Sequence, residues 1–143
     1  MRILLFISIF ACSVMSWGQT NQEYTDAQAA MKADLFIKEA YALNEKVAGV
    51  CNDLSAMGLL YEVAEQAVRK LNDWPEHNPH GQALVPYYSC RQSMVNVQSY
   101  AYACANGVYK GKAEKYIQRR WLEDSASCTA AIRSSGVSQE LSN

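Results

Sequence analysis

The chain has 143 residues, 13 of them basic and 14 acidic, and its formal net charge is −1. This balance argues against nucleic acid as a partner, and the length predicts a single domain with a modest core. The sequence contains no Gly-x-Ser-x-Gly elbow, no His-Glu-x-x-His pair and no phosphate-binding glycine loop, so we expect no enzymatic activity.

Residues 1–18 have the three parts of a secretory signal peptide. Arg2 provides the positive start, and a nearly unbroken apolar stretch follows it. Ser16 and Gly18 are the two small residues that cleavage before Gln19 requires. An uncleaved anchor is disfavoured because the apolar stretch is shorter than the ~20 residues that span a bilayer. No later stretch is apolar and long enough to span a membrane either.

Lipid attachment at Cys12 is the alternative way to process this N-terminus, and it would tether the protein to a membrane. The bulky Phe10 suits such a site poorly, and the chain stays apolar beyond Cys12 as far as Trp17. We therefore expect cleavage before Gln19 and a periplasmic or secreted protein without a lipid.

Removal of Cys12 with the signal leaves an even number of cysteines in an oxidising compartment. No two of them have Cys-x-x-Cys spacing, which excludes a redox dithiol or zinc finger of that type. The sequence therefore predicts two structural disulfides, formed by Cys51, Cys90, Cys104 and Cys128.

Two amphipathic helices are predicted in the first half of a domain that spans 25–134, between a flexible leader (19–24) and a disordered tail (135–143). Thr25 and Gln28 form a capping box at the start of the first helix. Its apolar positions recur at spacings of three and four: Ala33, Phe36, Ala40, Leu43, Val47 and Val50. The second helix, which ends before Pro75, repeats this spacing: Met57, Leu60, Ala64, Ala67 and Leu71.

Two further helices follow a long connector over 73–82. Pro86 suits the first turn of the third helix. The apolar stripe of that helix is the clearest in the chain: Tyr87, Cys90, Met94, Val97, Ala101, Cys104 and Val108. Gly107 and Gly111 bracket a short turn. The fourth helix, over 112–133, has its own stripe: Ala113, Ile117, Trp121, Cys128 and Ile132.

Four helices joined by short, long and short connections predict an all-α fold, a disulfide-stapled up-down-up-down four-helix bundle. The alternative merges the first two helices into one kinked rod through residues 51–53. In the bundle, Cys51 and Cys104 lie at the same end, close to the first and third turns. Cys90 and Cys128 lie at similar distances before and after the third turn. The predicted pairs are therefore Cys51–Cys104 and Cys90–Cys128, since other pairings exceed the ~7 Å limit between Cα atoms.

His77 and His80 lie in the long connector and are the only histidines. Two imidazoles could in principle hold zinc or copper, but no third strong ligand accompanies them on a fixed face. We expect an ordinary solvated connector, and neither a metal nor a cofactor.

The predicted binding surface surrounds the third turn, where basic residues mix with aromatic ones. Tyrosine, tryptophan and arginine dominate binding hot spots, and we select Tyr102, Tyr109, Arg119 and Arg120. The alternative is that the tyrosines simply pack and the charges only face solvent. A basic patch favours an acidic partner, and reversal of both arginine charges is expected to weaken binding without unfolding the domain.

The function predicted from these features is a binding protein of the cell envelope or extracellular space. It would act through protein–protein contact, as an inhibitor or immunity-type protein does. The alternative is a small-ligand carrier with a site between the helices, since the inner alanines permit either a cavity or close packing.

Overall fold

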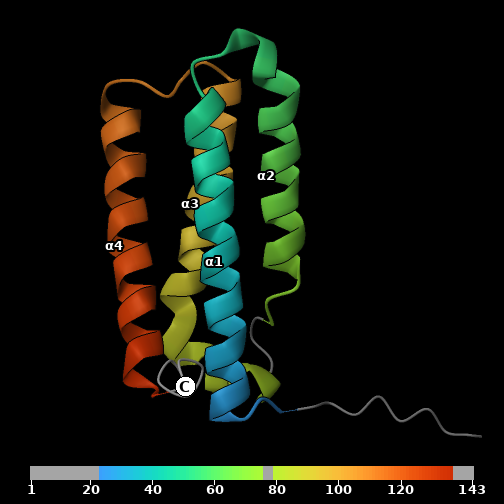
Figure 1. Cartoon of the computed structure of the whole chain (residues 1–143), viewed down its shortest axis with the longest axis vertical. Coiled ribbons are helices and arrows are strands. Elements are labelled where there is room, and N and C mark those ends of the chain that lie inside the picture. The colour runs from blue at the N-terminus through green and yellow to red at the C-terminus, as the bar shows by residue number, and fades with distance from the viewer. Residues whose placement is uncertain (1–22, 76–78, 137–143) are drawn as a thin grey trace, which may run out of the picture.

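The structure is a computed structural model that describes residues 23–75 and 79–136. The predicted signal peptide, residues 19–22, His77 and the tail from 137 onward lie outside the described residues, as does the side chain of His80. The described part contains four helices and no strand, which confirms the all-α fold (Figure 1). They are α1 (Asp26–Val50), α2 (Met57–Asn72), α3 (Tyr88–Ala105) and α4 (Lys112–Ser134).

The four helices alternate in direction, as predicted for an up-down-up-down bundle. The α1–α2 and α3–α4 connections lie at one end of the molecule, and the α2–α3 connector lies at the other (Figure 1). α3 packs against each of the other three helices, while α2 and α4 flank the α1–α3 pair on opposite sides. The kinked-rod alternative is wrong, because α1 ends at Val50 and α2 runs back beside it.

Local capping explains where α1 and the 3-10 turn before α2 begin. The capping box predicted for Thr25 and Gln28 is present at α1. Between α1 and α2, a 3-10 turn (Leu54–Ala56) starts at Asp53, whose carboxylate accepts hydrogen bonds from the hydroxyl and backbone N–H of Ser55. These two bonds stabilise the charged form and lower the pKa of the Asp53 carboxyl.

The α3–α4 turn is set by two glycines with positive φ. Gly107 (φ 68°) closes a Schellman motif, in which its own N–H reaches Cys104 O and the N–H of Val108 reaches Ala103 O. Gly111 (φ 61°) then starts α4. Because α3 ends at Ala105, Val108 lies beyond the helix and is 54% exposed, so its predicted place on the inner stripe is wrong.

The connector before α3 also departs from the prediction. It winds into a 3-10 segment (Pro79–Tyr87), so Pro86 precedes α3 instead of lying in its first turn. Leu84 and Tyr87 from this segment are buried, as is Trp74 just after α2. The Trp74 ring meets Phe36 edge-on at 4.9 Å between ring centroids. Together these side chains close the end of the core opposite the α3–α4 turn.

Small side chains fill the centre of the bundle. The predicted inner alanines of α1, α2 and α3 have no exposed surface: Ala33, Ala40, Ala64, Ala67 and Ala101. They allow the helices to approach closely, while larger residues such as Leu60 and Met94 fill the remaining space. The alanines are therefore used for packing in the described bundle.

Both predicted disulfides are confirmed. Cys51–Cys104 ties the end of α1 to the end of α3, with a Cα separation of 5.0 Å. Cys90–Cys128 joins α3 to α4 toward the other end, with a Cα separation of 4.7 Å. Within residues 23–75 and 79–136, no helix combines the length and apolar character needed to cross a bilayer.

Candidate binding site

The two halves of α4 are packed differently. Cys128 and Ile132, in its C-terminal half, are buried. Ala113, Ile117 and Trp121, the predicted inward residues of its N-terminal half, are only partly buried. The Cys90–Cys128 disulfide holds the C-terminal half of α4 against α3, whereas the N-terminal half leaves space beside α1.

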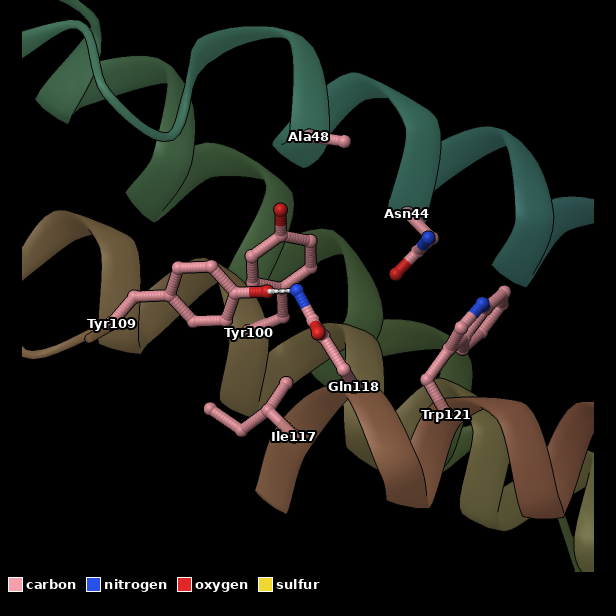
Figure 2. A pocket seen from close by; sticks show the side chains of 7 residues that line it. All are labelled: Asn44, Ala48, Tyr100, Tyr109, Ile117, Gln118 and Trp121. Carbon is pink, nitrogen blue, oxygen red and sulfur yellow. Dashed lines mark hydrogen bonds between the residues drawn. The ribbon is translucent and has the colours of Figure 1, made fainter. Parts of the chain in front are cut away.

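That space is a half-open pocket of about 180 Å³ between α1, α3 and α4 (Figure 2). Its lining comes from four segments: Asn44 and Ala48 of α1, Tyr100 of α3, Tyr109 of the turn, and Ile117, Gln118 and Trp121 of α4. In Figure 2, Trp121 lies on one side of the hollow and the two tyrosines lie on the other. We call this hollow the α1–α4 pocket.

Three of its seven lining residues are aromatic, and the positions of their rings are set by contacts with other rings. Tyr100 and Tyr109 pack at 4.5 Å between ring centroids, with their planes tilted by 41°. Trp121 meets the ring of Tyr41 edge-on at 5.1 Å. Each wall is therefore held by a neighbour on a different segment of the chain.

The electrostatic character of the pocket is shown by Tyr100. Partial burial of this phenol raises its pKa to about 12, helped by the neighbouring phenol of Tyr109 and the carboxylate of Glu114. The site therefore disfavours a negative charge at this ring. Tyr100 stays a neutral hydrogen-bonding group throughout the physiological pH range.

Two carboxamides give the pocket its polar edge. Gln118 donates from Nε2 to the phenol oxygen of Tyr109 at 3.0 Å and to Glu114 at 3.5 Å. Asn44 lies across the hollow on α1 (Figure 2). None of the lining residues carries a charge. The pocket thus combines aromatic walls with amide groups that can both donate and accept hydrogen bonds.

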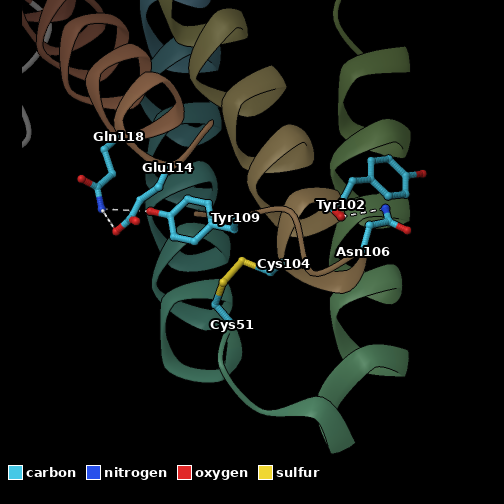
Figure 3. The surroundings of a disulfide bond; sticks show 7 residues. All are labelled: Cys51, Tyr102, Cys104, Asn106, Tyr109, Glu114 and Gln118. Atoms are coloured by element: carbon cyan, nitrogen blue, oxygen red, sulfur yellow. Dashed lines mark hydrogen bonds between the residues drawn. A yellow bond between two sulfur atoms is a disulfide. The ribbon is translucent and has the colours of Figure 1, made fainter. Parts of the chain in front are cut away.

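The structure brings only one of the four predicted binding residues into this pocket, namely Tyr109. Tyr102 faces the opposite side of α3, where its ring lies 6.1 Å from Tyr61 of α2. Figure 3 shows the Cys51–Cys104 disulfide between the two tyrosines. Tyr102 and Tyr109 therefore lie on different faces of the same end of the bundle.

The two arginines lie on α4 and differ in their surroundings. Arg119 is exposed, and its Nε lies 3.9 Å from a carboxylate oxygen of Glu123, a weak ion pair. Its guanidinium carbon lies over the ring of Tyr116, 5.7 Å from the ring centroid. Arg120 binds Asp124 at 3.0 Å, and this nearly buried carboxylate also accepts a 2.8 Å hydrogen bond from Asn96 of α3.

This contact corrects one expectation. Reversing the charge of Arg120 would place a carboxylate beside Asp124, so such a variant would disturb the α3–α4 interface. Arg120 therefore cannot serve as a surface probe that leaves the fold intact, whereas Arg119 can.

The sequence alone did not identify Asn44, Ala48 or Gln118 as site residues. Asn44 and Ala48 lie beside the inner stripe of α1, and nothing in their local sequence separates them from other surface residues of a helix. Tyr100 and Trp121 were recognisable as aromatic residues close to the turn. Their common pocket follows only from the packing of α4 against α1 and α3.

The candidate metal ligands His77 and His80 lie outside the residues whose side chains the structure describes. Among the described residues, no three histidine, cysteine, aspartate or glutamate side chains gather as a metal site would require.

Neither a protein-family model, nor a curated protein, nor a solved structure matches this chain.

Proposed function

We propose that the chain is an exported binding protein that acts through protein–protein contact, and that its partner docks over the α1–α4 pocket. The observation that carries this proposal is the pocket itself, a half-open hollow lined by three aromatic side chains beside the predicted binding turn. Tyrosine and tryptophan in partly buried positions are frequent anchors of protein interfaces.

Two properties of the pocket favour contact over catalysis or carriage. Its lining includes neither a carboxylate, nor an imidazole, nor a free thiol, and the described cysteines are all in disulfides. Its volume of about 180 Å³ is below the ~300–1,000 Å³ typical of small-molecule sites. A single side chain of a partner fits such a space better than a whole ligand does.

The charge around the pocket supports an acidic partner. Lys110, Lys112, Lys115 and Arg119 are exposed at the turn and along the first turns of α4. Positive charge at this rim raises the rate of encounter with an acidic surface. An inhibitor or immunity-type protein, which blocks a toxin or enzyme by contact, fits this combination of a rigid scaffold and a charged rim.

Export is proposed from the signal peptide over residues 1–18, and it agrees with the presence of two disulfides, which persist in oxidising compartments. Intact-mass analysis of the protein from its native source should give a chain that starts at Gln19 without a lipid. A mass that includes diacylglycerol on Cys12 would overturn the lipid-free form.

The contact function is tested with a matched pair of charge reversals. Arg119 and Arg69 each pair with a glutamate one turn away at 3.9 Å, and their side chains are 65% and 64% exposed. A partner captured with the mature protein should bind Arg119→Glu about tenfold more weakly, equivalent to about 1.4 kcal/mol. Arg69→Glu, on α2 away from the pocket, should bind it unchanged. Equal affinity of both variants would refute docking at α4.

A further inference from the structure

The size of the α1–α4 pocket is close to that of one aromatic ring. A cavity of about 150 Å³ in another protein interior holds a benzene molecule, and this pocket measures about 180 Å³. Resting on the contact function proposed above, we infer that the pocket takes a single uncharged aromatic side chain of an acidic partner segment.

The walls suit such a guest by their chemistry. Aromatic rings attract one another in offset or edge-on arrangements at ring-centroid distances of ~4.5–7 Å. Tyr100, Tyr109 and Trp121 bound the hollow on two sides (Figure 2), and each already makes such a contact with a ring of the protein. A guest ring would extend these contacts into one cluster.

Amide groups at the edge would bind the main chain of the guest. Gln118 uses its Nε2 for Tyr109 and Glu114, so its Oε1 is the group that can accept a bond from a peptide N–H. Asn44 on α1 offers both a donor and an acceptor from the other wall. A peptide group presents the complementary pair, which favours a segment of protein over a free ring.

Charge decides between an aromatic guest and a cationic one. Aromatic walls also bind lysine, arginine and quaternary ammonium groups, and the Glu114 carboxylate near Gln118 would help them. However, the lining itself has no carboxylate, and the rim carries Lys115 and Arg119. These basic side chains repel a cation and attract acidic residues that flank a neutral ring.

The test uses the mature protein, uniformly labelled with ¹⁵N, and three side-chain probes. The indole N–H signal of Trp121, assigned through Trp121→Phe, is followed during titration with N-acetyl-phenylalanine amide, N-acetyl-leucine amide and N-acetyl-lysine amide. We expect a saturable shift with the phenylalanine probe, and affinities at least threefold lower for the other two. Tighter binding of the lysine probe would overturn the aromatic assignment in favour of a cation site.

A second pair of variants tests whether binding depends on the pocket or on the surface of α1 in general. Ala48 lines the pocket and is exposed, so Ala48→Phe should fill the hollow without disturbing the core. Ala42→Phe adds the same ring at another exposed position of α1. Ala48→Phe should abolish the phenylalanine shift and weaken partner binding at least tenfold, whereas Ala42→Phe should change neither.

The outcomes distinguish this inference from the function on which it rests. If the phenylalanine probe leaves Trp121 unmoved while Ala48→Phe still blocks the partner, the aromatic guest is excluded and the contact function stands. If the probe binds but the partner binds both Ala48→Phe and Arg119→Glu with unchanged affinity, docking at the pocket is refuted. The assignment of the aromatic guest to that partner is then refuted as well.

Discussion

The phenol oxygen of Tyr109 accepts a 3.0 Å hydrogen bond from Nε2 of Gln118, which joins the α3–α4 turn to the second turn of α4. The same tyrosine packs its ring against Tyr100 of α3. One side chain therefore connects three segments at the end of the pocket (Figures 2 and 3). Because both contacts form within the free protein, this wall is in place before a partner arrives, which reduces the entropic cost of binding.

Tyr100 should produce a late step in the alkaline titration of the protein. Its pKa is raised to about 12 from the ordinary value of 10.0 because partial burial disfavours the phenolate. The folded state therefore gains stability from this group below pH 10.0, and loses it as the pH rises toward about 12. Phenolate absorbance should show this step in the folded protein, and Tyr100→Phe should remove it. A step that survives in the variant would assign the effect to another tyrosine.

The two disulfides should each contribute strongly to stability. Their cysteines are 53 and 38 residues apart, and closing loops of this length is worth about 4 kcal/mol in the chain-entropy model. Replacing either pair by serines should lower the free energy of unfolding by about 2–5 kcal/mol in urea titrations. Peptide mapping without reduction should recover Cys51 with Cys104 and Cys90 with Cys128. Recovery of Cys90 with Cys104 would contradict the bundle, since both lie on α3.

Asp124 and Glu123 are neighbours on α4 that should respond very differently to removal. Asp124→Ala leaves the partly buried Arg120 and Asn96 without their common acceptor, so it should cost about 1–3 kcal/mol of unfolding free energy. Glu123 is 54% exposed and its ion pairs are long, so Glu123→Ala should cost less than about 0.5 kcal/mol. Urea unfolding of the two variants measures this difference, and equal losses would mean that the Asp124 contacts do not stabilise the α3–α4 interface.

Two glycine-to-alanine substitutions should change stability in opposite directions. Gly49 lies within α1, and a methyl group added there would contact nothing within 4 Å. Gly49→Ala should therefore raise the free energy of unfolding by up to about 1 kcal/mol, through the better helix propensity of alanine. Gly111 has a φ of 61°, which strains any residue with a Cβ, so Gly111→Ala should lower it by about 1–2 kcal/mol. Thermal unfolding of both variants tests the prediction, and a stabilised Gly111→Ala would contradict the turn geometry.

Most of the fold was predictable because its determinants are local or follow from periodicity. The capping box at Thr25, the inner stripe of α1 and the glycines around the third turn are readable within short windows of sequence. The disulfide pairing followed once the helices were assumed to alternate in direction, since helix rise then places Cys90 level with Cys128. The prediction missed Val108 and Pro86, where turn geometry replaces the helical period.

The sequence by itself determined most positions of the helical stripes, the cysteine pairs and the basic, aromatic character of the turn. Only the tertiary structure decided which side chains share a surface. Tyr102 and Tyr109 are close in the chain but lie on different faces, whereas Asn44 and Trp121 are distant in the chain and line one pocket. The physical reason is that a pocket depends on how closely whole helices approach one another. The unequal packing of the two halves of α4 sets that separation here, and no short stretch of sequence records it.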